Sequence, residues 1–267
     1  MTPLQAAVLG IIQGLSEFLP ISSSAHLTLA PWLFGWEDPG LAFDVALHFG
    51  TLLAVLWYFR MEWLALIKAA FGILRTGRIE TPEKRRLIYL ILATIPGAIG
   101  GLLLQSRAES AFRSPQLIAI ALIVMGIILW LVDKVVDQAR VLGEMRWIDA
   151  LLIGLSQVIA LIPGVSRSGS TITTGRGLRF DREASAEFSF LMSMPIIAAA
   201  VVLEGPKALH QGGLTNELMA GVVASAVSGW LAISILMRYV SRHSYGIFAF
   251  YRVALGLAVL AVIYARG

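Results

Sequence analysis

The stretch AVLGIIQGLSEFLPISSSAHLT, residues 7–28, begins apolar enough to enter a bilayer but ends in polar residues. It carries the carboxylate of Glu17, the helix-breaking Pro20, three consecutive serines and His26. A similar order returns in LLIGLSQVIALIPGVSRSGSTIT, residues 151–173. Each copy has a glycine followed three residues later by a glutamine, then an apolar run, a proline and a serine cluster, with a one-residue slip in register between glutamine and proline. We interpret the two stretches as an internal repeat.

The composition places the repeat in a membrane protein. Hydrophobic residues make up 57% of the 267 residues and charged residues 14%, with a mean hydropathy of +0.78. This leaves too little polar surface to cover a water-soluble globule. Six segments between and after the repeats are long and apolar enough to span a bilayer: Phe43–Phe59, Leu87–Leu104, Gln116–Val132, Ser185–Leu203, Leu218–Met237 and Ile247–Tyr264.

The serine-rich tips are too polar to continue across the membrane, so we expect each to turn back as a re-entrant helix-loop-helix. Such a loop is tolerated at membrane depth only where protein or a water-filled cavity surrounds it. Each half of the chain then has one re-entrant segment and three spans, and the odd number of spans inverts the second half. The sequence predicts one integral membrane domain over residues 1–267: an all-α polytopic fold with six transmembrane helices and two re-entrant segments, in inverted repeats of about 1–134 and 147–267.

Basic residues orient this arrangement. Most lysines and arginines fall on one side of the expected fold, including the cluster RIETPEKRR at Arg78–Arg86. By the positive-inside rule this side is cytoplasmic, which places both chain ends and the mouth of the first re-entrant segment outside. The chain has no cysteine, so disulfides and thiolate metal sites are excluded. No basic face interleaved with aromatic residues suggests nucleic-acid binding.

The second tip, PGVSRSGST at residues 163–171, has the composition of an anion cradle. The planar fork of Arg167 suits phosphate oxygens, and the hydroxyls of Ser166, Ser168 and Thr171 add donors. Gly164 allows close backbone approach, and a helix that starts after the loop directs free N–H groups at the same anion. The alternative is a loop capped by its own serines, with the arginine reaching to the membrane interface.

The first tip offers groups for proton transfer. Gln13 and Glu17 lie four residues apart and share a helix face, and Ser22, Ser23 and His26 follow the proline. A carboxylate at membrane depth is expected to be paired, protonated or metal-bound, and a histidine acts as base, acid or nucleophile near neutral pH. A histidine considered alone is more often structural. The combination with the carboxylate, the serines and the anion cradle favours a functional role.

Four other ionisable residues lie within the expected spans. Asp44 and His48 share a helix face and either line the same cavity or bond each other. Glu187 and Arg252 are predicted to form a structural ion pair between spans.

These motifs resemble those of the bacterial undecaprenyl-diphosphate phosphatases of the bacitracin-resistance family. That family has an (E/Q)xxxE motif, matched here by Gln13 and Glu17, followed by a serine pair and a histidine, matched by Ser22, Ser23 and His26. Its second motif, PGxSRSxxT, is matched by residues 163–171. The likeness covers nearly the whole chain, including its length, its number of spans and the order of the motifs.

The resemblance implies an activity, a substrate and a cofactor. The family removes the terminal phosphate of undecaprenyl diphosphate and regenerates the monophosphate lipid that carries cell-wall precursors, in the bacterial cytoplasmic membrane, with a divalent cation such as Mg²⁺ or Ca²⁺. Gln13 stands where some members have a glutamate, so a two-carboxylate metal clamp cannot be assumed. Glu17 is the expected metal ligand, with the diphosphate and water completing the shell.

The expected mechanism has Arg167 hold the diphosphate and stabilise the transferring phosphoryl group. Either Ser23 attacks with His26 as its base, or His26 attacks directly or activates water; the sequence leaves these open. Two rival classes are a transporter or flippase of an anionic lipid or small anion, because inverted repeats with broken helices are a transporter architecture, and a structural membrane subunit.

Overall fold

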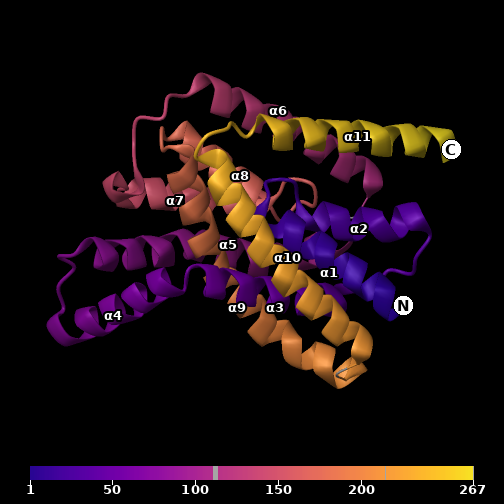
Figure 1. The fold of residues 1–267 in the computed structure, drawn as a ribbon, viewed down its shortest axis with the longest axis horizontal. Coiled ribbons are helices and arrows are strands. Elements are labelled where there is room, and N and C mark those ends of the chain that lie inside the picture. The colour runs from indigo at the N-terminus through magenta and orange to yellow at the C-terminus, as the bar shows by residue number, and fades with distance from the viewer. Residues whose placement is uncertain (111–113, 214, 267) are drawn as a thin grey trace.

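The computed structural model describes residues 1–110, 114–213 and 215–266. Within them the chain forms eleven α-helices, one short 3₁₀ helix and no β-strand (Figure 1). The helices are α1 Pro3–Phe18, α2 Ser23–Phe34, α3 Leu41–Tyr58, α4 Arg60–Thr76, α5 Pro82–Ser110, α6 Pro115–Val135, α7 Trp147–Ile159, α8 Arg167–Gly177, α9 Arg182–Gly212, α10 Asn216–Val240 and α11 Gly246–Arg266, with the 3₁₀ helix η1 at Leu142–Glu144.

Five helices within the described residues are long and apolar enough to cross a membrane: α5, α6, α9, α10 and α11. They contain five of the six predicted spans. The sixth, Phe43–Phe59, corresponds to α3, which continues into α4 through a bend of 82°. The backbone of Phe59, at φ −96° and ψ 26°, interrupts the helix there. The structure therefore has six spans only if the bent pair α3–α4 counts as one, and α4 is a helix that the sequence pattern did not predict.

Both polar stretches form two helices joined by a short loop. In the first, α1 ends at Phe18 and α2 begins at Ser23; in the second, α7 ends at Ile159 and α8 begins at Arg167. The residue before each second helix is a serine with positive φ, 77° at Ser22 and 73° at Ser166, a conformation that non-glycine residues rarely adopt. The two chain breaks therefore share an unusual backbone geometry.

The register of the repeat is continuous, contrary to the one-residue slip expected from the prolines. Residues 10, 13 and 22 of the first copy have the same spacing as residues 154, 157 and 166 of the second. The prolines are not equivalent, because Pro163 takes the position of Leu19, and Gly164 takes that of Pro20. Gly164 has a φ of +96°, which a proline cannot adopt.

Small residues let the paired helices pack closely against the spans. A Cβ atom on Gly14 of α1 would lie 2.0 Å from the Ser228 hydroxyl of α10, and one on Gly154 of α7 would lie 2.4 Å from the Ala93 carbonyl of α5. Close backbone approach of this kind is typical of helix packing in membranes. In Figure 1, α10 crosses in front of α1, while α6 and α11 lie side by side at the top. This packing fixes the ends of α1 and α7, where the two loops begin.

Candidate functional site

The two loops touch each other in the interior. The backbone N–H of Gly164 donates to the Ser22 hydroxyl at 3.1 Å, and the Ser168 hydroxyl donates to the Leu19 carbonyl at 3.1 Å. The Ser166 hydroxyl accepts from the Gly169 N–H at 3.0 Å and so caps α8 locally. Residues about 140 positions apart in the sequence therefore form one loop cluster.

A buried arginine of α11 binds both loops of this cluster. Arg252 has no exposed surface, and its guanidinium donates to the carbonyls of Pro20 at 3.1 Å, Gly164 at 2.8 Å and Val165 at 2.9 Å. The predicted ion pair between Arg252 and Glu187 is therefore wrong. Glu187 lies 3.3 Å from Arg86 of α5 instead, because α9 faces α5 at that level.

Glu17, at the end of α1, is the centre of the site. Its Oε1 lies 2.5 Å from Nη2 of Arg167, so an ion pair joins the end of α1 to the start of α8. Its Oε2 accepts from the Ser23 hydroxyl at 2.6 Å and from the Gln13 amide at 3.2 Å, and it lies 3.5 Å from Nε2 of His48. Glu17 is 6% exposed. A buried carboxylate with this set of partners is held as the anion by its neighbours.

Arg167 is the first residue of α8, so the free N–H groups of that helix lie beside its side chain. Its Nη1 donates to the Ser189 carbonyl of α9 at 3.4 Å, and the Thr171 hydroxyl lies 2.7 Å from the Ser189 hydroxyl. The guanidinium keeps further N–H groups for a ligand. A cation at a helix N-terminus is unfavourable by itself, so this placement is suited to an anion that both attract.

A cavity of about 250 Å³ opens in front of the ion pair. The second loop and helices α1, α2, α3, α5, α7, α8 and α9 contribute to its wall. Its polar lining comes from Glu17, Ser23, Ser24, His48, Gln157, Ser166 and Arg167. The remaining wall is apolar. Its size and its mixed lining suit a phosphate group attached to an apolar molecule.

The structure places the predicted site residues in the cavity wall, behind it in the loops and helix ends, and, for His26, apart from the ion pair. Glu17, Ser23, Ser166 and Arg167 line the cavity. Gln13 donates to Glu17 and is not among the residues that line the cavity. Ser22 and Gly164 lie in the two loops, and Ser168 and Thr171 lie near the start of α8.

His26 is the predicted residue that the structure places apart from the ion pair. Its Nδ1 lies 2.7 Å from the Ser22 carbonyl, and its Nε2 lies 2.7 Å from the Tyr251 hydroxyl of α11. Because a carbonyl only accepts, Nδ1 carries the proton, and Nε2 of the neutral ring accepts from the tyrosine. The histidine ring therefore faces α11, and the imidazole beside Glu17 belongs to His48.

Each of the two expected alternatives for Asp44 and His48 is met in part: of the two, His48 lines the cavity, and its Nδ1 lies 2.7 Å from the Asp44 backbone carbonyl. Gln157 and Ser189 were not predicted as site residues. The repeat contained a signal for Gln157, because it occupies the position that Gln13 takes in the first copy. Ser189 lies in the apolar span after α8, and no local pattern distinguishes it.

The oxygen atoms around Glu17 fit a hard divalent cation. The side chain of Gln13 is fully buried, and its Oε1 has no hydrogen-bond partner. Together with the Glu17 carboxylate and the Ser23 hydroxyl it supplies oxygen ligands of the kind that Mg²⁺ and Ca²⁺ prefer. No group of three or more His, Cys, Asp or Glu among the described residues forms a self-sufficient metal site. Such a cation would need oxygens from a ligand or water.

Comparison with known proteins agrees with these motifs. Residues 6–258 match the family model described as "Bacitracin resistance protein BacA". The chain is 61% identical over 266 residues to the undecaprenyl-diphosphatase of Gemmatimonas aurantiaca, with all of both chains covered. It is 51% identical to the undecaprenyl-diphosphatase of Pelotomaculum thermopropionicum, with 100% of this chain and 98% of the relative covered. That of Desulforudis audaxviator is 49% identical, with both chains covered completely. The chain belongs to the BacA bacitracin-resistance family.

Proposed function

We propose that this protein hydrolyses the terminal phosphate of undecaprenyl diphosphate and returns undecaprenyl phosphate to cell-wall synthesis. The observation that carries the proposal is the pair of Glu17 and Arg167, which come from α1 and α8 and meet at 2.5 Å beside a half-polar cavity. A fixed carboxylate, an adjacent hydroxyl and an arginine at a helix N-terminus are the groups that phosphoryl transfer needs. The names and full-length identity of the relatives support the same activity.

In the proposed reaction Arg167 and the first N–H groups of α8 bind the terminal phosphate. The arginine exchanges its contact with Glu17 for one with the phosphate oxygens, which frees the carboxylate. Ser23 donates to Glu17 at 2.6 Å, so the carboxylate is in place to take the hydroxyl proton as the serine oxygen attacks phosphorus. The bond from phosphorus to the bridging oxygen breaks, and undecaprenyl phosphate leaves. Water then releases the phosphate from the serine, and the proton returns from Glu17.

Glu17 and not His26 is the proposed proton acceptor for Ser23. Glu17 accepts directly from the serine, whereas both ring nitrogens of His26 are engaged with Ser22 and Tyr251. We assign His26 to positioning, because its Nδ1–H holds the Ser22 carbonyl one residue before the serine.

Glu17 and the free Oε1 of Gln13 would hold the divalent cation, with the diphosphate supplying further oxygens. When bound, the cation would neutralise part of the negative charge on the phosphate groups. A glutamine in place of a second carboxylate leaves the protein ligands with one negative charge, so we expect weak cation binding in the absence of substrate.

For the architecture we propose that α1–α2 and α7–α8 are re-entrant and related by a pseudo-two-fold axis in the membrane plane. The matched positive-φ serines support this, as does the exchange of partners between halves: α1 packs on α10, and α7 packs on α5. Arg252 also binds the carbonyls of Pro20 and Gly164, which occupy equivalent positions of the two loops.

We further propose that the protein lies in the cytoplasmic membrane with the cavity open to the outer side. The basic cluster at Arg78–Arg86 precedes and begins α5, and Gly97, which lines the cavity, lies past the middle of the apolar span Pro82–Leu104 of that helix. On α9 the cavity is lined by Ile196, Ile197 and Ala200, which lie past the middle of the apolar span Arg182–Leu203. The positive-inside rule then directs the opening outward.

The test is release of inorganic phosphate from undecaprenyl diphosphate by the purified protein in detergent, with and without a chelator. We expect turnover in Mg²⁺ or Ca²⁺ and its loss on chelation. Absence of release under all ion conditions, from protein that is folded by thermal melting, would contradict the proposal and favour an anion transporter.

A further inference from the structure

A second cavity, of about 510 Å³, lies between α3, α9 and α10. Its wall consists of apolar side chains together with Gly205 and Pro206 of α9. We call it the outer groove. With the basic ends of α5 and α9 in the cytoplasm, it lies in the outer half of the membrane, on the side to which the polar cavity opens.

The outer groove continues the polar cavity along two shared helices. On α9, Ile197 lines the polar cavity, and Val201 and Gly205 line the groove. Their spacing of four residues places them in one row on a helix face. On α3, His48 lines the polar cavity and Val45 lines the groove at a spacing of three. Eight residues of helix span about 12 Å, so the apolar path begins beside the polar site and runs away from it.

We propose that the outer groove binds the first isoprene units of the prenyl chain while its diphosphate lies against Arg167. This inference rests on the proposed function and adds a subsite to it. A branched hydrocarbon has no polar group, which suits a wall without donors or acceptors. Because lipid tails are equally apolar, close packing in the groove serves mainly to orient the substrate. Contacts remote from the reacting atoms can align those atoms and so raise reaction rates.

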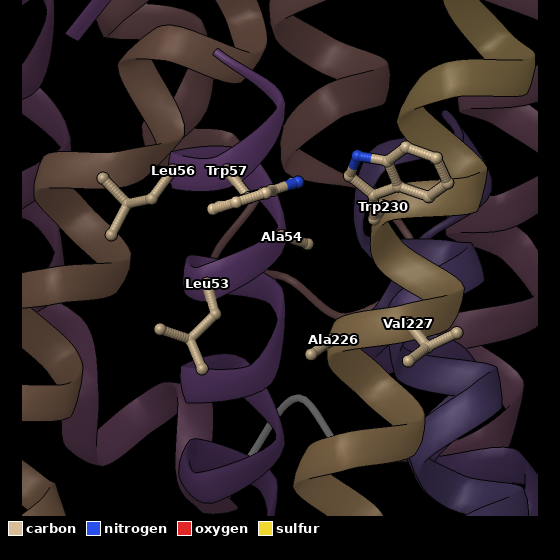
Figure 2. Close-up of a pocket in the computed structure, with 7 residues that line it drawn as sticks. All are labelled: Leu53, Ala54, Leu56, Trp57, Ala226, Val227 and Trp230. Atoms are coloured by element: carbon tan, nitrogen blue, oxygen red, sulfur yellow. The ribbon is translucent and has the colours of Figure 1, made fainter. Parts of the chain in front are cut away.

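A second apolar groove supplies a matched comparison. It measures about 620 Å³ and lies between α3 and α10, lined by Leu53, Trp57, Ala226 and Trp230 among others. Figure 2 shows the two tryptophan rings, one from each helix, at the same end of this groove. No residue of α9 lines it, so α3 is the one helix that it shares with the lining of the polar cavity. Bulk lipid can fill both grooves, but only the outer groove adjoins the polar cavity through two helices.

The test is Gly205→Phe, which fills the outer groove. A Cβ on Gly205 would have Val201 Cγ1 as its nearest neighbour at 3.8 Å, an ordinary contact, so the substitution does not force the backbone apart. Gly205 precedes Pro206, where a Cβ atom disfavours the helical backbone, so the melting temperature of the variant is compared with that of the unmodified protein. We expect kcat/KM for undecaprenyl diphosphate to fall roughly ten-fold or more, because the blocked groove no longer aligns the substrate. Inhibition by inorganic diphosphate, which needs only the polar cavity, should keep its Ki.

Ala226→Phe in the other groove is the control and should leave both constants unchanged. An unchanged kcat/KM for Gly205→Phe, or an equal fall for Ala226→Phe, overturns the inference. A rise in the Ki of inorganic diphosphate does so too, because it shows that the variant disturbs the polar site. Failure of the proposed function would give a different result: no phosphate release by the unmodified protein.

Discussion

At the scale of single residues, the site depends on two contacts of Glu17. Oε1 contacts Arg167 and Oε2 accepts from Ser23, so one carboxylate faces both the anion-binding group and the proposed nucleophile. Removing either partner leaves a buried carboxylate with fewer partners, which is costly. Substitutions must therefore be compared per folded molecule.

Arg167→Lys tests the need for a planar fork. Lysine keeps the charge but cannot contact Glu17 and the Ser189 carbonyl through two separate nitrogens, as Arg167 does at 2.5 and 3.4 Å. We expect kcat to fall by roughly 10²-fold or more, in line with the loss of transition-state donors elsewhere. Phosphate release by the folded, purified variant measures this, and near-normal turnover would show that the fork is not needed.

Ser23→Ala tests the nucleophile, and Ser24→Ala is its matched control. Both serines line the cavity, but Ser23 donates to Glu17 at 2.6 Å, whereas Ser24 lies 3.3 Å from the Ser22 hydroxyl. We expect Ser23→Ala to lose at least about 10³-fold in kcat and Ser24→Ala to lose little. Steady-state kinetics with undecaprenyl diphosphate decides between them. Similar losses in both variants would contradict a specific role for Ser23.

At the scale of helices, close packing of α1 and of α7 against spans sets where each loop starts. The contact of α1 with α10 passes through Gly10 and Gly14, and Glu17 follows within one turn. A displacement of α1 would therefore displace the carboxylate from Arg167.

Gly14→Leu should separate α1 from α10. Its Cβ would lie 2.0 Å from the Ser228 hydroxyl and 2.5 Å from the Ser225 carbonyl, so the backbones must move apart. Overpacking of this kind costs about 1–3 kcal/mol, and we expect a lower melting temperature together with reduced turnover. Gly101→Leu on α5 is the control, because nothing lies within 4 Å of its Cβ. Equal melting temperatures for the two variants would show that the close contact is unimportant.

The start of α7 makes stability depend on pH. Burial raises the pKa of Asp149, but hydrogen bonds from Arg140 and the Arg146 N–H outweigh it, so the net pKa is lowered. The pKa of Asp149 is lower in the folded protein than in the unfolded chain, where it is about 3.9, so the ionised carboxylate stabilises the fold above that pH. This stabilisation is lost as the pH falls through the folded-state pKa. Melting temperatures between pH 7 and pH 3 should fall at the acidic end. The Asp149→Asn variant should melt at a lower temperature at pH 7, and its melting temperature should fall less between pH 7 and pH 3. Parallel curves of melting temperature against pH for the two proteins would show that Asp149 does not cause the acid-dependent loss of stability.

At the scale of the whole molecule, the first helix of each half packs against a span of the other half, so neither half forms the site alone. Glu17 belongs to the first half and Arg167 to the second, and Arg252, in the last helix, binds both loops. The proposed orientation places the basic loops in the cytoplasm and the cavity opening outside.

Single cysteines in this cysteine-free chain test that orientation. Glu37, in the loop between α2 and α3, and Glu80, in the basic loop before α5, are both exposed. We expect an impermeant maleimide added to intact cells to label Glu37→Cys and not Glu80→Cys, which should react only after lysis. Labelling of Glu80→Cys in intact cells would reverse the proposed topology.

The sequence by itself determined the class of fold and most of the site's composition. Apolar length predicted five of the spans, because a bilayer of fixed thickness requires about 20 apolar residues per crossing. The sixth is a span only if α3 and α4, which bend at Phe59, count as one. The cost of polar groups at membrane depth singled out Glu17 and Arg167 before any contact between them was known.

Only the tertiary structure decided which polar groups face one another. Helix periodicity gives the face of a residue within its own helix but not the neighbour that this face meets. His26 therefore turned out to face Tyr251, while His48 approaches Glu17. Arg252 looked like a partner for Glu187 because both are charged residues in apolar spans. It binds loop carbonyls instead, since the positive-φ turns leave those carbonyls without helical donors, and a buried guanidinium can satisfy several of them at once.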